Sequence, residues 1–286
     1  MRQGTNSDSN IIEEKSDVGK KKYSSIMCEW KGKKEEVLWI TFKNERMLNA
    51  MTDVLQQEFL EVLEAARFDN SIRCVVITGS GEKAFSAGGD ISYFLTLDKL
   101  KAYDFLYERG NRVQHAITYM EKPVIGAVNG YCFAGGMEVA LCCDFVYASK
   151  NARFGLTEID IGLLPGWGGT VRLPRNILVR HAKEMIFKGG RITADEAYRV
   201  GLVNKVFDTI PELYEGVEEC VSIMMSKPPL SLRMAKNIIN NSITCGSMEA
   251  ALAIERGAFT WLFSSDDMKE GVNAFQEKRK PVFKGK

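Results

Sequence analysis

The sequence predicts an α/β fold followed by an α-helical C-terminal region. Strand-like and helix-like segments alternate as far as about residue 207. Segments 72–80 and 122–132 are apolar runs with the length and residue types of buried strands, and beyond Ile210 the pattern is almost entirely helical. The expected organisation is therefore a disordered polar tail over 1–24, an α/β core over 25–209 and a helical region over 210–286.

The first part of the core is predicted as units of strand and helix. Residues 36–44 alternate in the manner of a strand, and 51–69 form an amphipathic helix with Thr52 or Asp53 as its N-cap. The next elements are a buried strand over 72–80, a glycine loop over 81–94, a helix over 101–120, a buried strand over 122–132 and a segment over 136–149 that begins as a helix and ends as a strand. Both buried strands therefore end in glycine loops.

The second part of the chain contains a helix over 180–189 and then a capped helix that turns into a strand by residue 207. Thr193 is the predicted N-cap of that helix and Glu196 stands at its third position, which is the capping-box arrangement. Three helical segments follow Ile210. The last residues, 270–286, are predicted as a basic tail.

Composition excludes several classes of protein. The 286 residues are 45% apolar with a net charge of +1, which is ordinary for a globular protein and does not favour nucleic-acid binding. No apolar run reaches the roughly 20 residues of a membrane span. Seven scattered cysteines without a CxxC motif favour a reducing compartment, so a cytoplasmic location is expected. The two isolated histidines do not predict a metal site.

Two glycine loops, "FSAGGDI" and "GYCFAGGME", each follow a buried strand and enter a helix. Glycine allows a sharp turn and close approach of a ligand to the backbone. A helix N-terminus presents free N–H groups and the positive end of the helix dipole. Two such ends directed at one point would form an oxyanion hole. Neither loop matches a P-loop or a dinucleotide fingerprint, and ordinary turn chemistry is the alternative reading.

Two glutamates are candidates for acid–base chemistry. Glu138 follows the paired glycines of the second loop, and Glu158 lies among apolar residues before a glycine-rich loop. Carboxyl groups in apolar surroundings have raised pKa values, which suit proton transfer. The alternative is a carboxylate that caps backbone N–H groups, and this is the preferred reading of Asp160. Glu138 and Glu158 are 20 positions apart in the sequence, so only the fold could bring them together.

The motifs "FSAGGDI", "PVIGAVNGYCFAGGMEVALCCDFVYAS", "ARFGLTEIDIGLLPGWGGTVRLPR" and "GGRITADEAYRVGLVNKVF" occur in this order. From about residue 35 to the C-terminus the chain resembles the crotonase (enoyl-CoA hydratase/isomerase) superfamily. The resemblance implies a spiral of ββα units. It also implies C-terminal helices that form homotrimers, often paired into hexamers.

The resemblance also implies an enoyl-CoA hydratase mechanism. The N–H groups of Gly89 and Gly135 would hold the thioester oxygen of an acyl-CoA. Glu138 would act chiefly as the base on a water molecule, and Glu158 would deliver a proton to Cα. Coenzyme A is part of the substrate, so no cofactor and no metal is expected. The substrate-binding positions implied by the resemblance are Arg46, Met47, Ala87, Gly88, Asp90, Ile91, Phe133, Gly166, Trp167 and Lys278.

Residues at three positions differ from those common in the family, so the identity of the acyl group is not determined. Thr157 stands where the family often has proline, Trp167 where it often has a small residue, and Phe133 adds bulk before the oxyanion glycines. A cyclic dienoyl-CoA is therefore an alternative substrate, and packing of Trp167 outside the pocket is an equal possibility. Enoyl-CoA isomerase is a further alternative, although isomerases commonly keep only one glutamate.

Two more distant alternatives come from other classes. A serine hydrolase or thioesterase would use Ser86 in "AFSAGG" as its nucleophile, with His115 or His181 as its base. A non-catalytic protein could also keep the fold. The serine hydrolase is disfavoured because residue 84 is Ala and not Gly and because a triad would need one of these histidines nearby. The paired glutamates argue against a non-catalytic protein.

Overall fold

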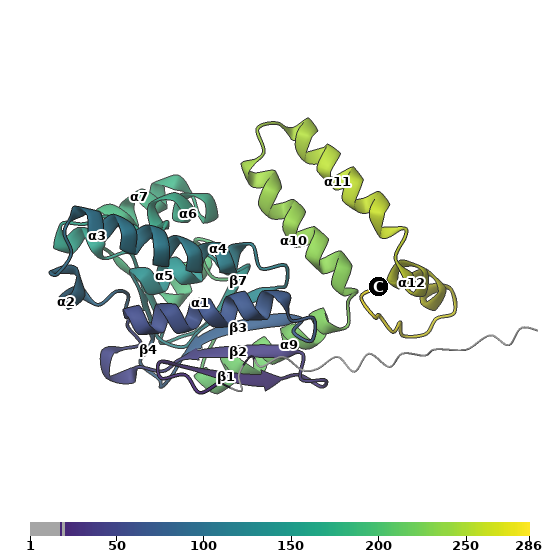
Figure 1. Ribbon diagram of the computed structural model, residues 1–286, viewed down its shortest axis with the longest axis horizontal. Helices are drawn as coiled ribbons and strands as arrows, with labels where there is room; N and C mark the ends of the chain where they lie inside the picture. The colour runs from purple at the N-terminus through teal and green to yellow at the C-terminus, as the bar shows by residue number, and fades with distance from the viewer. Residues whose placement is uncertain (1–17, 19–20) are drawn as a thin grey trace, which may run out of the picture.

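A six-stranded sheet and a smaller four-stranded sheet form the centre of the computed structural model, which describes residues 18 and 21–286 (Figure 1). The large sheet has the order β1-β2-β3-β5-β7-β10, with β1 antiparallel to β2 and the other neighbours parallel. Its strands are β1 (Ile26–Lys31), β2 (Val37–Phe42), β3 (Cys74–Gly79), β5 (Val124–Val128), β7 (Phe145–Ser149) and β10 (Lys205–Phe207). The α/β prediction is confirmed.

The small sheet follows the large one strand by strand. It has the order β4-β6-β8-β9, where β4 is Ala84–Ser86, β6 is Tyr131–Phe133, β8 is Arg153–Gly155 and β9 is Arg191–Thr193. In the chain, β3 leads into β4, β5 into β6 and β7 into β8, and a helical segment follows each pair. The chain therefore repeats a ββα unit. These three-residue strands and β1 were not predicted, because short strands leave little periodicity in a sequence.

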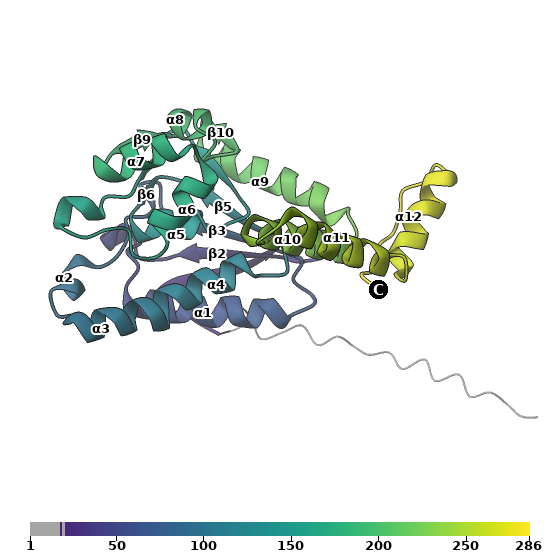
Figure 2. The same cartoon turned by 90° about the horizontal axis from the view of Figure 1, so that it is seen from above.

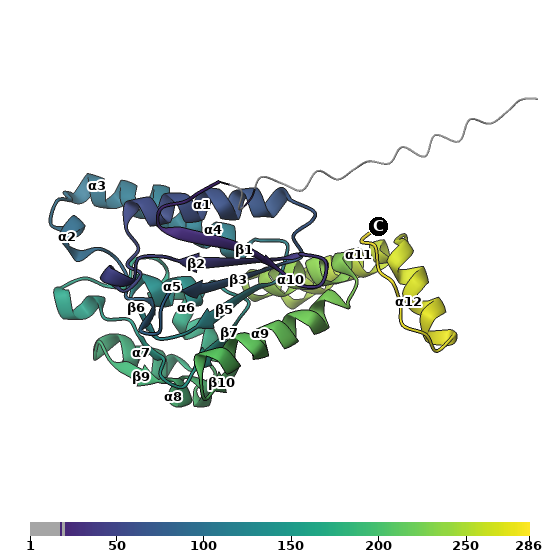
Figure 3. The same ribbon diagram turned by 90° about the horizontal axis from the view of Figure 1, so that it is seen from below.

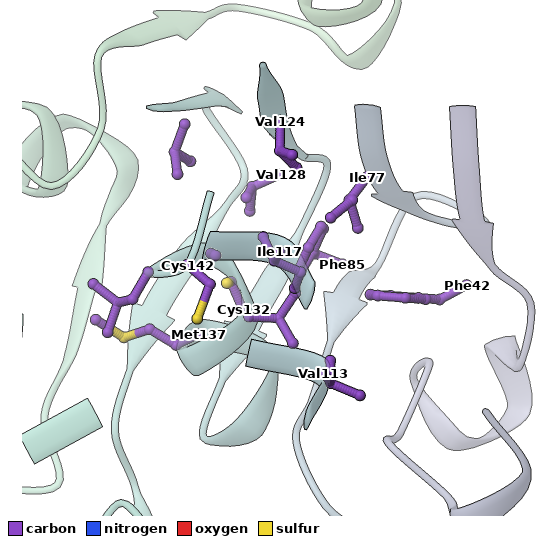
Figure 4. Packing of buried hydrophobic residues seen from close by; sticks show 14 of the residues in the cluster. Phe42, Ile77, Phe85, Val113, Ile117, Val124, Val128, Cys132, Met137 and Cys142 are labelled. Atoms are coloured by element: carbon purple, nitrogen blue, oxygen red, sulfur yellow. The ribbon is translucent and has the colours of Figure 1, made fainter. Parts of the chain in front are cut away.

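The strands of the large sheet are apolar throughout because both of their faces are covered. Along β2, Leu38, Ile40 and Phe42 enter one hydrophobic core, and Val37 and Trp39 enter another. The first core lies under the helices of one face and continues to the small sheet, as the close packing of buried side chains in Figure 4 shows. The second core lies under α9 on the opposite face (Figure 3).

Helices cover both faces of the sheet. Helices α1 and α4 lie on the face opposite α9 (Figure 2). The helices of the core are α1 (Asp53–Phe68), α2 (Ile91–Phe94), α3 (Lys99–Asp104), α4 (Arg112–Thr118), α5 (Gly135–Ala140), α6 (Gly169–Asn176), α7 (Val179–Phe187) and α8 (Ala194–Arg199), with short 3-10 turns η1 (Glu45–Met47) and η3 (Glu158–Ile161). The Thr52 side chain caps α1, and Thr193 and Glu196 form the predicted capping box of α8.

The helix predicted over 101–120 contains a change of helix type. Between α3 and α4 the chain forms a π-helix, η2 (Phe105–Asn111). A π-helical turn inserts an extra residue per turn and alters which side chains face a given side, and such turns are frequent at functional sites. The periodicity of the sequence indicated helix but not this change of register.

The C-terminal region consists of α9 (Ile210–Met225), α10 (Pro229–Thr244), α11 (Met248–Leu262) and α12 (Asp266–Gln276). Helices α10 and α11 form a hairpin that projects from the core (Figure 1). Near its middle, α10 is tied to the core by an ion pair of 2.8 Å between Lys236 and Asp144. None of the described helices is both long enough and apolar enough to span a membrane.

The prediction of a basic tail over 270–286 is wrong for its first residues, which belong to α12. Ser265 caps α12 by accepting a hydrogen bond from the N–H of Met268. The buried Asp267 side chain accepts hydrogen bonds from the N–H groups of Lys284 and Gly285, at 2.6 and 2.8 Å. The end of the chain therefore folds back on α12. This contact spans 17 residues of sequence, so local pattern does not reveal it.

The predicted polar tail over 1–24 lies mostly outside the described residues. Within the described part, the N–H groups of Ser24 and Ser25 each donate a hydrogen bond of 2.8 Å to Glu58 of α1. The backbone is therefore attached to the core just before β1 begins.

Candidate active site

The two glycine loops meet in the folded chain. Gly88 has a φ of +102°, and a Cβ atom at this position would lie 2.6 Å from the Cβ of Ala134. A Cβ at Gly136 would lie 2.4 Å from the carbonyl oxygen of Ser86. Side chains at these two positions would push the loops apart. Glycine therefore allows the close contact that places both helix starts beside one cavity.

Gly89 and Gly135 both line a cavity of about 490 Å³. Gly135 is the first residue of α5, so its N–H has no acceptor within the helix. Gly89 comes two residues before α2 and forms an isolated bridge to Met51. The cavity wall therefore includes both glycines of the predicted oxyanion hole.

The rest of the cavity is mostly apolar. The lining side chains from α2 to η2 include Phe94, Leu97, Ala102, Phe105 and Leu106, and those from the later loop are Leu163, Leu164 and Trp167. Three acidic residues are part of the same wall: Glu138, Glu158 and the exposed Asp98, whose side chain caps α3. The fold thus brings the two predicted acid–base residues together in apolar surroundings.

Glu138 lies in α5 and is almost completely buried, with 2% of its surface exposed. Its Oε1 atom accepts hydrogen bonds from the N–H groups of Trp167, at 2.7 Å, and Gly169, at 2.8 Å. The glycine-rich loop before α6 therefore holds this carboxyl group in a fixed position. Gly168, with a φ of +93°, provides the turn between the two donors.

Glu158 begins the 3-10 turn η3 and has different surroundings. Its Oε2 atom is buried, and no hydrogen-bond partner for it exists within residues 18 and 21–286. A buried polar atom without a protein partner is commonly satisfied by water or by a ligand. Asp160, in the same turn, is exposed and does not line the cavity.

The two carboxyl groups influence each other's ionisation. Burial and then the charge of Glu158 raise the pKa of Glu138 to about 8, against the opposing effect of the two backbone donors and Arg172. Burial also raises the pKa of Glu158. Because the high pKa of Glu138 includes repulsion from an ionised Glu158, it describes loss of the last proton from the pair. The pair therefore holds one proton up to about pH 8.

Known proteins share both the sequence and the fold. The family model described as "Enoyl-CoA hydratase/isomerase" matches residues 32–286. A crotonyl-CoA hydratase of Syntrophomonas wolfei is 40% identical over 262 residues, which cover 91% of this chain and 98% of that protein. A short-chain-enoyl-CoA hydratase of Clostridium acetobutylicum is 39% identical and covers 90% of this chain and 96% of its own length.

The chain belongs to the enoyl-CoA hydratase/isomerase family. A crystal structure of an enoyl-CoA hydratase from Bacillus anthracis matches with a TM-score of 0.87 and 34% identity, over 92% of this chain and 100% of that one. The crotonase fold predicted from the motifs is thereby confirmed. It comprises two mixed sheets of ββα units followed by C-terminal helices.

The structure places the predicted site residues of this family member in three groups. The first group lines the cavity and consists of Gly89, Gly135, Glu138, Glu158, Gly166 and Trp167. The second lies beside it: η1 carries Arg46 and Met47, and the carbonyl of the next residue accepts a hydrogen bond of 2.9 Å from the N–H of Ala87. Gly88 and Asp90 flank Gly89 in the chain, and Ile91 follows Asp90.

Phe133 and Lys278 form the third group, away from the cavity wall. The Phe133 ring stacks on Tyr131 with centroids 5.2 Å apart, and the guanidinium of Arg191 lies 5.0 Å from its centre. Lys278 follows α12, at the opposite end of the protein from α2 and α3 (Figure 1). Its neighbour Arg279 forms a two-pronged ion pair with Glu270, at 2.6 and 2.8 Å. Within one chain, Lys278 does not reach the cavity.

Sequence reasoning missed the contribution of the π-helix. Phe105 and Leu106 line the cavity from η2, and Leu163 and Leu164 line it from the loop after η3. The leucine pair stands within the quoted motif "EIDIGLLPGWGG", between Glu158 and Trp167. The position of this pair between two predicted site residues could have indicated that it lines the cavity.

Ser86 does not have the surroundings of a serine nucleophile. It is fully buried, and its hydroxyl accepts a hydrogen bond of 3.3 Å from the N–H of Gly88. His115 packs instead against Tyr119, with ring centroids 4.4 Å apart. In the described part of the chain, Ser86 has no hydrogen bond to a histidine.

Proposed function

We propose that this protein hydrates the double bond of an α,β-unsaturated acyl-CoA. The observation that supports this most strongly is that the buried Glu138 and the half-buried Glu158 line one mostly apolar cavity together with Gly89 and Gly135. Hydration needs a base for water, an acid for a carbon atom and stabilisation of an oxyanion. This cavity offers a group for each task.

The proton inventory of the pair suits the reaction. Glu138 receives two backbone hydrogen bonds, which favour its charged form, whereas the buried Oε2 of Glu158 has no donor from the described residues. The resting pair carries its proton on Glu138, whose pKa is the one raised to about 8, and the productive state is the arrangement in which this proton has moved to Glu158. Glu138 is then the base and Glu158 is the acid.

The reaction proceeds by addition of water across the double bond. Glu138 takes a proton from water as the oxygen bonds to Cβ, and the electrons of the double bond move toward the thioester oxygen. The N–H groups of Gly89 and Gly135 stabilise the negative charge there, and one such donor is worth about 3 kcal/mol. Glu158 then protonates Cα. Exchange of a proton with solvent returns the pair to its starting state.

The acyl group is proposed from the relatives and the cavity together. Two relatives carry the names crotonyl-CoA hydratase and short-chain-enoyl-CoA hydratase. The mostly apolar wall fits a hydrocarbon acyl group. A cyclic dienoyl-CoA is the alternative substrate. An isomerase would need no activated water, and the second carboxyl group favours hydration over it.

We also propose a homotrimer, with a hexamer as the alternative. Helices α10 and α11 expose large apolar side chains on a hairpin that projects from the core: Ile239, Ile243, Leu252, Phe259 and Phe263. Exposed apolar patches of this kind are typical of interfaces. In such an assembly Lys278 would reach the coenzyme A that is bound to another subunit, and not the one bound to its own. The cytoplasmic location stays a prediction.

A panel of CoA thioesters tests the function. Crotonyl-, hexenoyl-, decenoyl- and cyclic dienoyl-CoA are each incubated with the protein, and hydration is followed by loss of the conjugated enoyl absorbance. Glu138→Gln and Glu158→Gln should each lower hydration by about two to four orders of magnitude. Ser86→Ala is the control and should keep most of the activity. Near-normal turnover by either glutamine variant would refute the two-carboxylate mechanism.

A further inference from the structure

The indole of Trp167 lies between the oxyanion helix α5 and the π-helix η2. A Cβ atom at Gly135 would lie 3.4 Å from both Cε3 and Cζ3 of the indole. On the other side of the ring, a Cβ atom at Gly110 would lie only 2.4 Å from Nε1. Trp167 lines the cavity and is 5% exposed. The ring therefore fills the space between the two elements.

The indole is held in place from several directions. The backbone N–H of Trp167 donates to Glu138 at 2.7 Å, which ties the residue to the catalytic carboxyl group. The ring of Phe105, from the start of η2, packs against the indole with centroids 5.7 Å apart and a tilt of 36°. A ring confined by Phe105, Gly110 and Gly135 cannot turn away without displacing a neighbouring backbone.

Gly110 is required by this arrangement. It is buried within the seven residues of η2, and any side chain there would overlap the pyrrole edge of Trp167. The large residue and the missing side chain are thus complementary in shape. The π-helical register directs Gly110, rather than a residue with a side chain, at the indole.

We infer that Trp167, seated on Gly110, is a fixed wall that restricts this enzyme to short acyl groups. The inference rests on the proposed function. With the thioester oxygen at Gly89 and Gly135, and the reacting carbons between Glu138 and Glu158, the indole stands beside the carbons that follow the double bond. A crotonyl group is too short to contact the indole. A long chain has to displace the indole or bend away from it.

The test compares chain-length preference in wild type and Trp167→Ala. The ratio of kcat/KM for decenoyl-CoA to that for crotonyl-CoA should rise about tenfold or more in the variant, because a few methylenes in an apolar pocket are worth this much. Trp167→Phe should give a smaller rise. Phe68→Ala removes an exposed ring at the end of α1 and should leave the ratio unchanged. An unchanged ratio in Trp167→Ala would overturn the inference.

The contact with Gly110 supplies a second, independent measurement. Gly110→Ala should lower the melting temperature of the wild type but have little effect in the Trp167→Ala background, where the overlap is absent. Equal losses in both backgrounds would show that the indole is not seated on Gly110.

Failure of the wall and failure of the function have different signatures. If wild type hydrates crotonyl-CoA and decenoyl-CoA equally well, the function stands and the wall is wrong. If wild type hydrates no thioester, the proposed function is wrong. The wall is then tested by measuring the binding of butyryl-CoA and decanoyl-CoA by calorimetry. Trp167→Ala should raise the affinity for decanoyl-CoA and leave the affinity for butyryl-CoA unchanged.

Discussion

Replacing Glu138 by glutamine should change the pH dependence of stability as well as abolish activity. Glutamine has the shape of glutamate, and its side-chain carbonyl can accept the same hydrogen bonds from Trp167 and Gly169. The substitution therefore removes one ionisable group from a buried site while leaving its packing nearly intact. Any difference between the two proteins that grows with pH reports the cost of charging Glu138.

The magnitude follows from the raised pKa. Burial and the charge of Glu158 raise the pKa of Glu138 from its ordinary 4.5 to about 8. The folded protein thus keeps a proton that the unfolded chain has lost, so wild-type stability falls as pH rises through this window. At ~1.4 kcal/mol per pH unit, the Glu138→Gln variant should gain on the order of 5 kcal/mol relative to wild type between about pH 4.5 and pH 8.

Urea unfolding of both proteins across this pH range, at equal protein concentration, measures the effect. Above about pH 8 the two stability curves should run parallel, because Glu138 is then ionised in the folded and the unfolded states. Parallel curves over the whole range would refute the reasoning. They would mean that water or a neighbouring group solvates the charge on Glu138 without cost.

Two other predictions concern the carboxyl pair and the C-terminal hairpin. The kcat/KM for crotonyl-CoA should fall above about pH 8 as Glu138 and Glu158 lose their shared proton, and a rate that rises through this pH would show that the doubly ionised pair is the active form. Lys236→Ala should destabilise the protein by about 3 kcal/mol in urea unfolding, because it leaves Asp144 partly buried without its cation. Adding Asp144→Asn should recover part of the lost free energy of unfolding. A double variant as unstable as Lys236→Ala alone would contradict this explanation.

The order of elements was predictable because their signals are local. The apolar run of 72–80 becomes β3, and the run of 122–132 contains β5. The capping box at Thr193 needed only residues three positions apart. The motifs also identified the glycines and glutamates of the cavity before any geometry was known.

Elements that depend on distant contacts were not predictable. The strands β4, β6, β8 and β9 have three residues each and exist because they pair with one another across the chain. Asp267 of α12 accepts hydrogen bonds from the end of the chain. The boundary between α12 and the tail therefore depends on a contact that exists only in the folded chain. The π-helix η2 packs against Trp167 through Gly110, a contact between residues 57 positions apart, whereas its sequence alone has the pattern of an ordinary helix.

By itself, the sequence determined the α/β class, the family and the choice of candidate site residues, since each depends on residue type and local spacing. Only the tertiary structure decided how those groups behave. It placed Glu138 and Glu158, 20 positions apart, in one apolar cavity, and burial together with repulsion then left them a single proton. It also placed the indole of Trp167 in the cavity wall and Phe133 outside it. Charge, dielectric surroundings and the shape of a pocket are properties of neighbours in space, and the chain acquires those neighbours only by folding.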